Sequence, residues 1–206
     1  MPGVRTVSLF LAMLAILAEV SVVTAVVLVA GSRVSPAVRR AREDLVASVE
    51  PVSLWIALGV AAIATAGSLY YSEVAHFTPC RLCWYQRIAM YPLVPVLAIA
   101  AVRRDFRIKP YVATLAALGG AISVYHMLVE RFPNLESSTC DPNNPCSLIW
   151  VNTFGYLTIP TMALSAFALL VVLALTGARR AREPEPDHVA ATVPELVDEE
   201  PSREPS

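Results

Sequence analysis

The sequence predicts an all-α integral membrane protein, with a four-helix transmembrane core preceded by one additional N-terminal transmembrane helix. Hydrophobic residues make up 56% of the 206 residues, and the mean hydropathy is +0.57. This is too apolar for a soluble domain of that size. The net charge is only −1, yet the arginines gather in a few short segments between long apolar runs. Composition and charge pattern therefore indicate a chain that crosses a bilayer several times.

The first apolar run covers residues 7–31 and contains one charged residue, Glu19. It is long enough to span a bilayer, which takes roughly 20 apolar residues. The apolar core of a cleaved signal peptide is shorter, about 7–15 residues, so we expect a retained helix. Glu19 lies near its middle and is either a functional intramembrane acid or a protonated carboxyl hydrogen-bonded within the bundle.

The rest of the chain divides into four more spans and their connections. Residues 32–50 are rich in arginine and predict a basic loop with a short helix lying on the membrane surface. The predicted spans that follow are 52–76, about 83–102, 111–129 and about 154–176.

Proline and glycine mark special positions in these spans. Pro92 and Pro95 are expected to kink the third span, because neighbouring helices can satisfy the freed carbonyls. Gly119-Gly120 should permit close helix contact in the fourth span. The fifth span, as predicted, contains Pro160.

The predicted spans divide the chain into three regions. Residues 1–51 form the N-terminal helix and a basic cytoplasmic loop, and residues 52–176 form the four-helix core. Residues 177–206 are rich in Pro, Glu and Asp and predict a disordered cytoplasmic tail.

The orientation follows from lysine and arginine alone. Residues 32–50 hold four such residues, residues 103–110 hold four and residues 179–182 hold three, whereas the basic residues on the other side are isolated. The positive-inside rule therefore predicts a plasma-membrane protein whose N-terminus is extracytoplasmic and whose C-terminus is cytoplasmic. Both pairs of cysteines would then face the extracytoplasmic side, where disulfides are the default.

The first cysteine pair, Cys80 and Cys83, lies between the second and third spans. A Cys-x-x-Cys disulfide closes a very small loop and stabilises the fold little, which favours thiol exchange over a structural role. A helix that begins here would stabilise a thiolate at its N-terminus. Arg87 is four residues after Cys83 and would share its helix face. The second pair, Cys140 and Cys146, lies in a loop and could be either a structural staple or an exchange partner.

Metal binding is the alternative use of four cysteines. A site of four thiolates would suit zinc, and a transporter or scaffold could hold a soft cation between two pairs. Arg81 and Arg87 place positive charge at the first pair, which disfavours a cation there. We therefore expect no metal site.

Residues 80–87, Cys-Arg-Leu-Cys-Trp-Tyr-Gln-Arg, together with the later loop pair, resemble the DsbB family of disulfide-bond formation membrane proteins. The shorter-loop BdbC type of Gram-positive bacteria is the more similar form. The resemblance covers about residues 52–176 and includes the segment Asn152–Pro160 that opens the last span. The family core has four helices, so the first helix and the tail are additions to it.

The resemblance implies a quinone-dependent thiol oxidoreductase. A DsbA-like thioredoxin-fold oxidase outside the membrane would pass electrons to Cys140–Cys146, then to Cys80–Cys83, and finally to a membrane quinone, menaquinone or ubiquinone. Cys140 would be attacked first. The quinone would be bound by Cys83, Arg87 and His126, the last because family members carry a histidine in that helix.

A vitamin-K-epoxide-reductase-like protein is the nearest enzymatic alternative. In that group the loop cysteines come first and the quinone-side pair lies in a late helix. The order here is the reverse, which argues against it.

Overall fold

The computed structural model describes residues 2–137 and 140–176. These residues form helices, turns and loops, with two isolated β-bridges. The tail predicted at residues 177–206 lies outside the described residues. The helices are α1 Pro2–Gly31, α2 Pro36–Val49, α3 Ser53–Leu69, α4 Arg81–Met90, α5 Leu93–Arg103, α6 Lys109–Arg131 and α7 Ile159–Leu175.

Length and composition make this an integral membrane protein that crosses the bilayer several times. Four helical stretches are long and apolar enough to cross a membrane: Gly3–Gly31, Pro36–Val74, Arg81–Arg103 and Phe106–Arg131. The fifth predicted span corresponds to Ile159–Leu175, a shorter apolar helix. The expected all-α membrane class is therefore confirmed.

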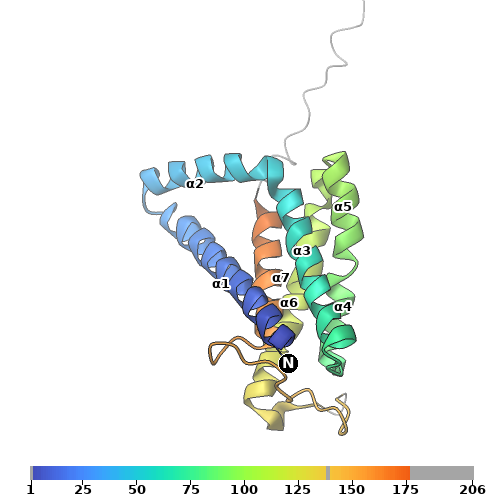
Figure 1. Ribbon diagram of the computed structural model, residues 1–206. Coiled ribbons are helices and arrows are strands. Elements are labelled where there is room, and N and C mark those ends of the chain that lie inside the picture. The colour runs from blue at the N-terminus through green and yellow to red at the C-terminus, as the bar shows by residue number, and fades with distance from the viewer. Residues whose placement is uncertain (1, 138–139, 177–206) are drawn as a thin grey trace, which may run out of the picture.

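Helices α3 to α7 form the core bundle, in which α6 and α7 pack closely (Figure 1). The closest approach is at Gly119 of α6, where an added Cβ would lie 2.3 Å from the Phe167 ring. Phe167 is almost fully buried there, with Leu170 one turn later on α7. Gly119 thus provides the close helix contact expected of this segment.

The third predicted span is two helices, α4 and α5, separated at Tyr91-Pro92. Pro92 precedes α5 and makes the break, as its position predicted. Pro95 produces no second break, because it falls in the first turn of α5, where backbone N–H groups have no intrahelical partner to lose.

The fifth span begins later than predicted, at Ile159 and not at residue 154. Thr153 and Leu157 hydrogen-bond to each other in both directions, at 2.9 Å each. The turn between them places Phe154 and Gly155 in the left-handed region, with φ of 56° and 80°. A helix cannot run through this turn, so it starts beyond it, with Pro160 in its first turn rather than its interior.

The additional helix α1 touches the core along its first two thirds. Leu11 lies against Gly67 of α3, where a Cβ would be 2.8 Å from its side chain. Ser8 accepts a hydrogen bond from Tyr71 at 3.0 Å. Glu19 accepts one from Ser165 of α7, at 2.9 Å. The Glu19 carboxyl is thus hydrogen-bonded within the bundle, and a functional role for it stays a prediction.

Beyond Glu19, α1 diverges from the bundle and leads into α2, which lies across the other helices (Figure 1). The valines of this last part of α1 are exposed, Val23 and Val26 at 60% each. No residue of α2 is buried. This arrangement fits the predicted surface helix, with α1, α2 and the bundle forming three sides of a triangle.

Candidate functional site

The first cysteine pair lies at the N-terminus of α4. Cys80 is the N-cap residue, with an extended backbone, and its sulfur accepts a hydrogen bond from the Cys83 backbone N–H at 3.3 Å. The two sulfurs are 2.9 Å apart as free thiols. Cys80 is buried, whereas Cys83 is partly exposed. The predicted helix start at this pair is therefore present, and the two thiols differ in their surroundings.

The second pair forms a disulfide in the loop between α6 and α7. Cys140 and Cys146 are bonded, with their Cα atoms 5.9 Å apart. The Glu136 carboxylate fixes the loop by accepting a hydrogen bond from the Cys146 backbone N–H. The Asn144 amide donates to the Pro79 carbonyl at 3.2 Å, which ties this loop to the residue before Cys80.

The two pairs belong to one buried cluster. Cys80, Cys140 and Cys146 pack together with Val129 and Leu82, and Cys83 packs against this cluster. The loop thus covers the Cys-x-x-Cys pair directly. Disulfide exchange between the pairs needs a sulfur of one pair to reach a sulfur of the other, and the shared cluster keeps the two pairs close together.

His126 of α6 stands between the pairs. Its Nε2 is 3.0 Å from the Cys146 carbonyl oxygen and 3.7 Å from the Cys80 sulfur. A carbonyl can only accept, so Nε2 carries the proton and donates to both. Gln86 lies 3.3 Å from Nδ1 and fixes the ring from the other side. His126 is therefore a proton-bearing contact between Cys80 and the disulfide loop.

Cys80 has the surroundings of a stable thiolate. The hydrogen bond from the Cys83 thiol is the largest cause that lowers its pKa, and the contact with His126 acts in the same direction. Burial opposes both, yet the pKa of Cys80 falls to about 4. The sequence predicted a stabilised thiolate at this helix end, with Arg87 on the face of Cys83. The lowered pKa of Cys80 fits a thiolate at this end of α4, and the separate roles of the two sulfurs stay a prediction.

Arg87 of α4 is buried. Its Nη2 donates to the Ser68 carbonyl of α3 at 3.0 Å. The guanidinium also lies over the Trp84 ring, 5.2 Å from its centroid, and 6.0 Å from that of Tyr91. These contacts hold the cation in place and leave further N–H groups for a ligand.

Cys83, Gln86 and Arg87 line one end of a large cavity of about 1250 Å³. Stacked aromatic rings continue this end: Phe77 lies 5.8 Å from Tyr71 and 4.8 Å from Trp150, centroid to centroid. His126 is not among the described residues that line the cavity. Its predicted role in quinone binding stays a prediction, and the contacts shown by the structure are with the cysteines.

Three contributors to this site were missed in the sequence. Gln86 is part of the motif but was given no role, and Asn144 and Glu136 lie in the loop around the second pair. The signal for Gln86 was its position three residues after Cys83, which places it on the same helix face. No local pattern indicates that Asn144 would meet Pro79.

One group of side chains could still hold a metal ion. Cys80, Cys83 and His126 each offer one ligand atom, and these three atoms lie within 4.8 Å of one another. Glu136, Cys140 and Cys146 form a second such group, but the two sulfurs there are joined in a disulfide and are not thiolates. The absence of metal thus stays a prediction, to be checked by metal analysis of the purified protein.

Comparison with known proteins gives a family match. The model of the disulfide bond formation protein DsbB matches residues 51–177. Disulfide bond formation protein C of Bacillus subtilis (strain 168) is 47% identical over 122 residues, which cover 59% of this chain and 88% of that protein. Probable disulfide formation protein C 1 of Bacillus anthracis is 43% identical over 121 residues, 58% of this chain and 87% of that protein. No solved structure matches the chain.

Proposed function

Because the chain belongs to the DsbB family of disulfide bond formation proteins, and is on that ground a membrane oxidoreductase, we propose an electron route through its four cysteines. Electrons enter at the Cys140–Cys146 disulfide, pass to Cys80 and Cys83, and leave to a membrane quinone. The observation that carries this proposal is the single buried cluster that contains both pairs, with His126 in contact with each.

The first step takes place at the loop. A reduced thioredoxin-fold oxidase of the DsbA type attacks one sulfur of Cys140–Cys146, and its second thiol closes its own disulfide. The partner loses two electrons and two protons, which the loop pair gains as two thiols. Cys140 is 8% exposed and Cys146 is 1% exposed. The greater exposure supports Cys140 as the sulfur attacked, as the resemblance implied.

The second step is exchange between the pairs. A thiolate of the reduced loop attacks the Cys80–Cys83 disulfide at Cys80, and Cys83 leaves toward the cavity and takes up the proton that the attacking sulfur gave up. The second loop thiol then restores Cys140–Cys146, and Cys80 is released together with the proton of that thiol. Nε2 of His126 donates a hydrogen bond to the departing Cys80 sulfur, and a stabilised thiolate leaves faster.

The third step re-forms Cys80–Cys83 at the cavity end. A quinone bound there supplies the electron sink, since it takes up two electrons and two protons and departs as the quinol. The residues present suit such a group: Gln86 and Arg87 offer N–H donors to its oxygens, and Phe77 and Trp150 offer ring faces. Arg87 holds the positive charge where negative charge develops.

We place both cysteine pairs outside the cytoplasm. Both lie at one end of the bundle, and α2 with its arginines lies at the other (Figure 1). The basic loops support a cytoplasmic position for that second end. The substrate oxidase then meets the loop pair in the oxidising compartment.

The direct test is turnover by the full chain in detergent. Mixing it with a reduced thioredoxin-fold oxidase and a quinone should consume two partner thiols for each quinol formed. Cys83→Ser should abolish quinol formation. Thiol oxidation that proceeds at the same rate without any quinone under anaerobic conditions would contradict the proposed route.

Trapping tests the order of the cysteines. Cys146→Ser removes the resolving thiol, so a covalent complex of Cys140 with the partner should accumulate on a non-reducing gel. Cys140→Ser is the matched control and should yield no such complex. If both loop variants keep full activity and the partner is captured by Cys83 in a Cys80→Ser background, the loop disulfide is a structural staple and the relay is wrong.

A further inference from the structure

We infer that α1, which lies outside the family match, forms one wall of a groove that holds the isoprenoid tail of the quinone. The inference rests on the proposed function and extends it. It assigns a role to a helix that the residues matched to the family, 51–177, do not include.

The groove exists because α1 is fixed to the core along only part of its length. Glu19 is the last residue of α1 with a hydrogen bond to the core, receiving one from Ser165 at 2.9 Å and one from Tyr156 at 3.3 Å. After it α1 departs from α7 while α2 closes the cytoplasmic end (Figure 1). The space between α1, α3 and α7 therefore widens away from the cysteines.

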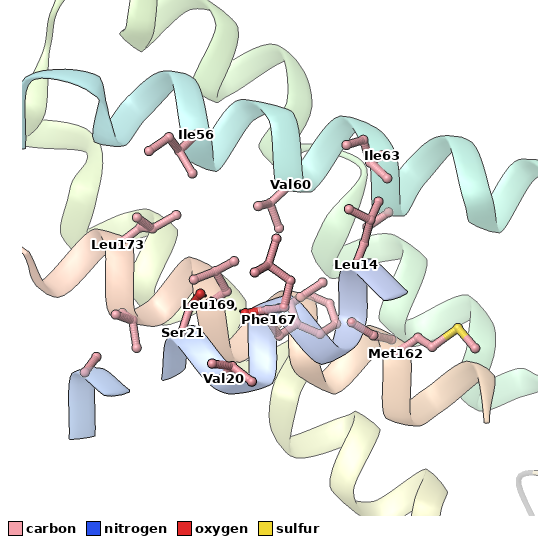
Figure 2. Close-up of a pocket in the computed structure, with 18 of the residues that line it drawn as sticks. Leu14, Val20, Ser21, Ile56, Val60, Ile63, Met162, Phe167, Leu169 and Leu173 are labelled. Carbon is pink, nitrogen blue, oxygen red and sulfur yellow. Dashed lines mark hydrogen bonds between the residues drawn. The ribbon is translucent and has the colours of Figure 1, made fainter. Parts of the chain in front are cut away.

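Three helices supply the walls, and their side chains point into the space between them (Figure 2). Ile56, Val60 and Ile63 are spaced i, i+4, i+7 and lie on one face of α3. Met162, Leu169 and Leu173 lie on α7, and Leu14 and Ser21 lie on α1. The walls are thus almost wholly apolar.

The groove is continuous with the redox end. Cys83 and Arg87 line the outer end of the same cavity. Its volume of about 1250 Å³ exceeds the roughly 300–1,000 Å³ of ordinary small-molecule pockets. Ile63 and Ile56 are still 42% and 41% exposed, so the groove opens sideways toward lipid. A molecule with a polar ring at Cys83 and a long apolar chain fits this shape.

The chemistry of the end at Cys83 favours a quinone over a membrane phospholipid as the occupant. The end at Cys83 has donors and aromatic faces for a flat ring, beside the thiol that must give up electrons. An acceptor that diffuses in the bilayer needs a lateral opening to reach that thiol. The groove supplies the opening and α1 forms its outer wall.

A pair of isoleucine variants tests the groove by kinetics. Ile63→Trp places an indole in the groove, and Ile99→Trp places one on α5 at an exposed position, 59% exposed, outside the cavity lining. In Ile63→Trp, the ratio of KM for a long-tailed quinone to KM for a tail-less quinone should rise roughly fivefold or more. The reason is that the indole occupies the space that the tail needs. Ile99→Trp should leave this ratio unchanged. Equal ratios in the two variants would overturn the inference while leaving the proposed function intact.

Photolabelling gives a readout that needs no turnover. A quinone with a diazirine at the far end of its tail should label the α1 and α3 segments 14–21 and 56–63, and unlabelled long-tailed quinone should compete with it. Label confined to α5 or α6, or label displaced by phospholipid and not by quinone, would show that the groove holds no quinone tail. If the chain reduces no quinone at all, the proposed function fails, and this labelling still decides whether the groove binds the tail.

Discussion

The contact of His126 with Cys80 predicts a measurable change in the pKa of this cysteine. His126→Phe keeps a ring of similar size in the buried site and removes the Nε2–H that lies 3.7 Å from the Cys80 sulfur. A hydrogen bond to a charged group contributes about 1.5–3 kcal/mol, and one pKa unit corresponds to about 1.4 kcal/mol. The pKa of Cys80, about 4, should therefore rise by about one to two units. It stays below that of an ordinary thiol because the Cys83 thiol still donates to it.

The sign of the pH effect follows from the lowered pKa. The thiolate stabilises the reduced fold fully above the pKa of an ordinary thiol, and this contribution is lost as the pH falls through about 4. In His126→Phe the loss should be complete at a higher pH, because only the folded-state pKa rises. Because a leaving thiolate of higher pKa departs more slowly, exchange between the pairs should slow by roughly 3- to 10-fold.

The assay is the ultraviolet absorbance of the thiolate, followed against pH in reduced protein whose loop cysteines are both serine. Tyr125→Phe is the control. Tyr125 is also on α6, and this change removes its hydrogen bond to the Leu135 carbonyl but keeps the ring that packs against the cysteine cluster. A titration midpoint that is the same in wild type and His126→Phe would refute the assigned contact. An equal rise in Tyr125→Phe would show that the effect is general loosening of α6.

Three further predictions concern the quinone, the packing and the orientation. Arg87→Ala should slow quinone reduction by roughly 30- to 1000-fold, as for loss of one donor to a developing oxyanion, and a lysine there should restore only part; unchanged quinone kinetics would contradict the assignment. Gly119→Ala should lower the free energy of unfolding by about 1–3 kcal/mol, measured by thermal unfolding in detergent, because its Cβ would lie 2.3 Å from Phe167. Gly59→Ala, with nothing within 4 Å of its Cβ, should not, and similar losses in both would refute the packing argument. A reporter fused after Arg182 should behave as cytoplasmic, and an extracytoplasmic signal would reverse the proposed orientation.

The span pattern was largely predictable because it depends on local composition. Apolar runs and the arginines between them locate the helices, and Pro92 marks the break between α4 and α5. The start of α7 was not predictable in the same way. Phe154 is apolar, and the left-handed turn at Phe154-Gly155 excludes the helix there. Hydropathy measures the preference of a segment for lipid and carries no information on the sign of its backbone φ angles.

The same distinction applies to the site, where local spacing was predictable and contacts between distant segments were not. The motif placed Cys80, Cys83 and Arg87 on one short helix, since their spacing is local. The partner of His126 could not be read in this way, because it lies 46 residues away at Cys80 and its distance depends on how α6 packs against α4. The groove was also beyond prediction. An apolar helix such as α1 gives no sign in its sequence of where it leaves its neighbours.

The shortness of α7 bears on the membrane itself. Its 17 residues reach about 26 Å at 1.5 Å per residue, less than the roughly 30 Å of a typical hydrocarbon core. A span shorter than the hydrocarbon core favours local thinning of the bilayer, which costs a fraction of a kcal/mol per ångström. Catalysis should consequently respond to acyl-chain length in reconstituted vesicles, with faster turnover in thin bilayers than in thick ones. Bilayer thickness would then affect the turnover rate of this protein independently of any lipid that it binds.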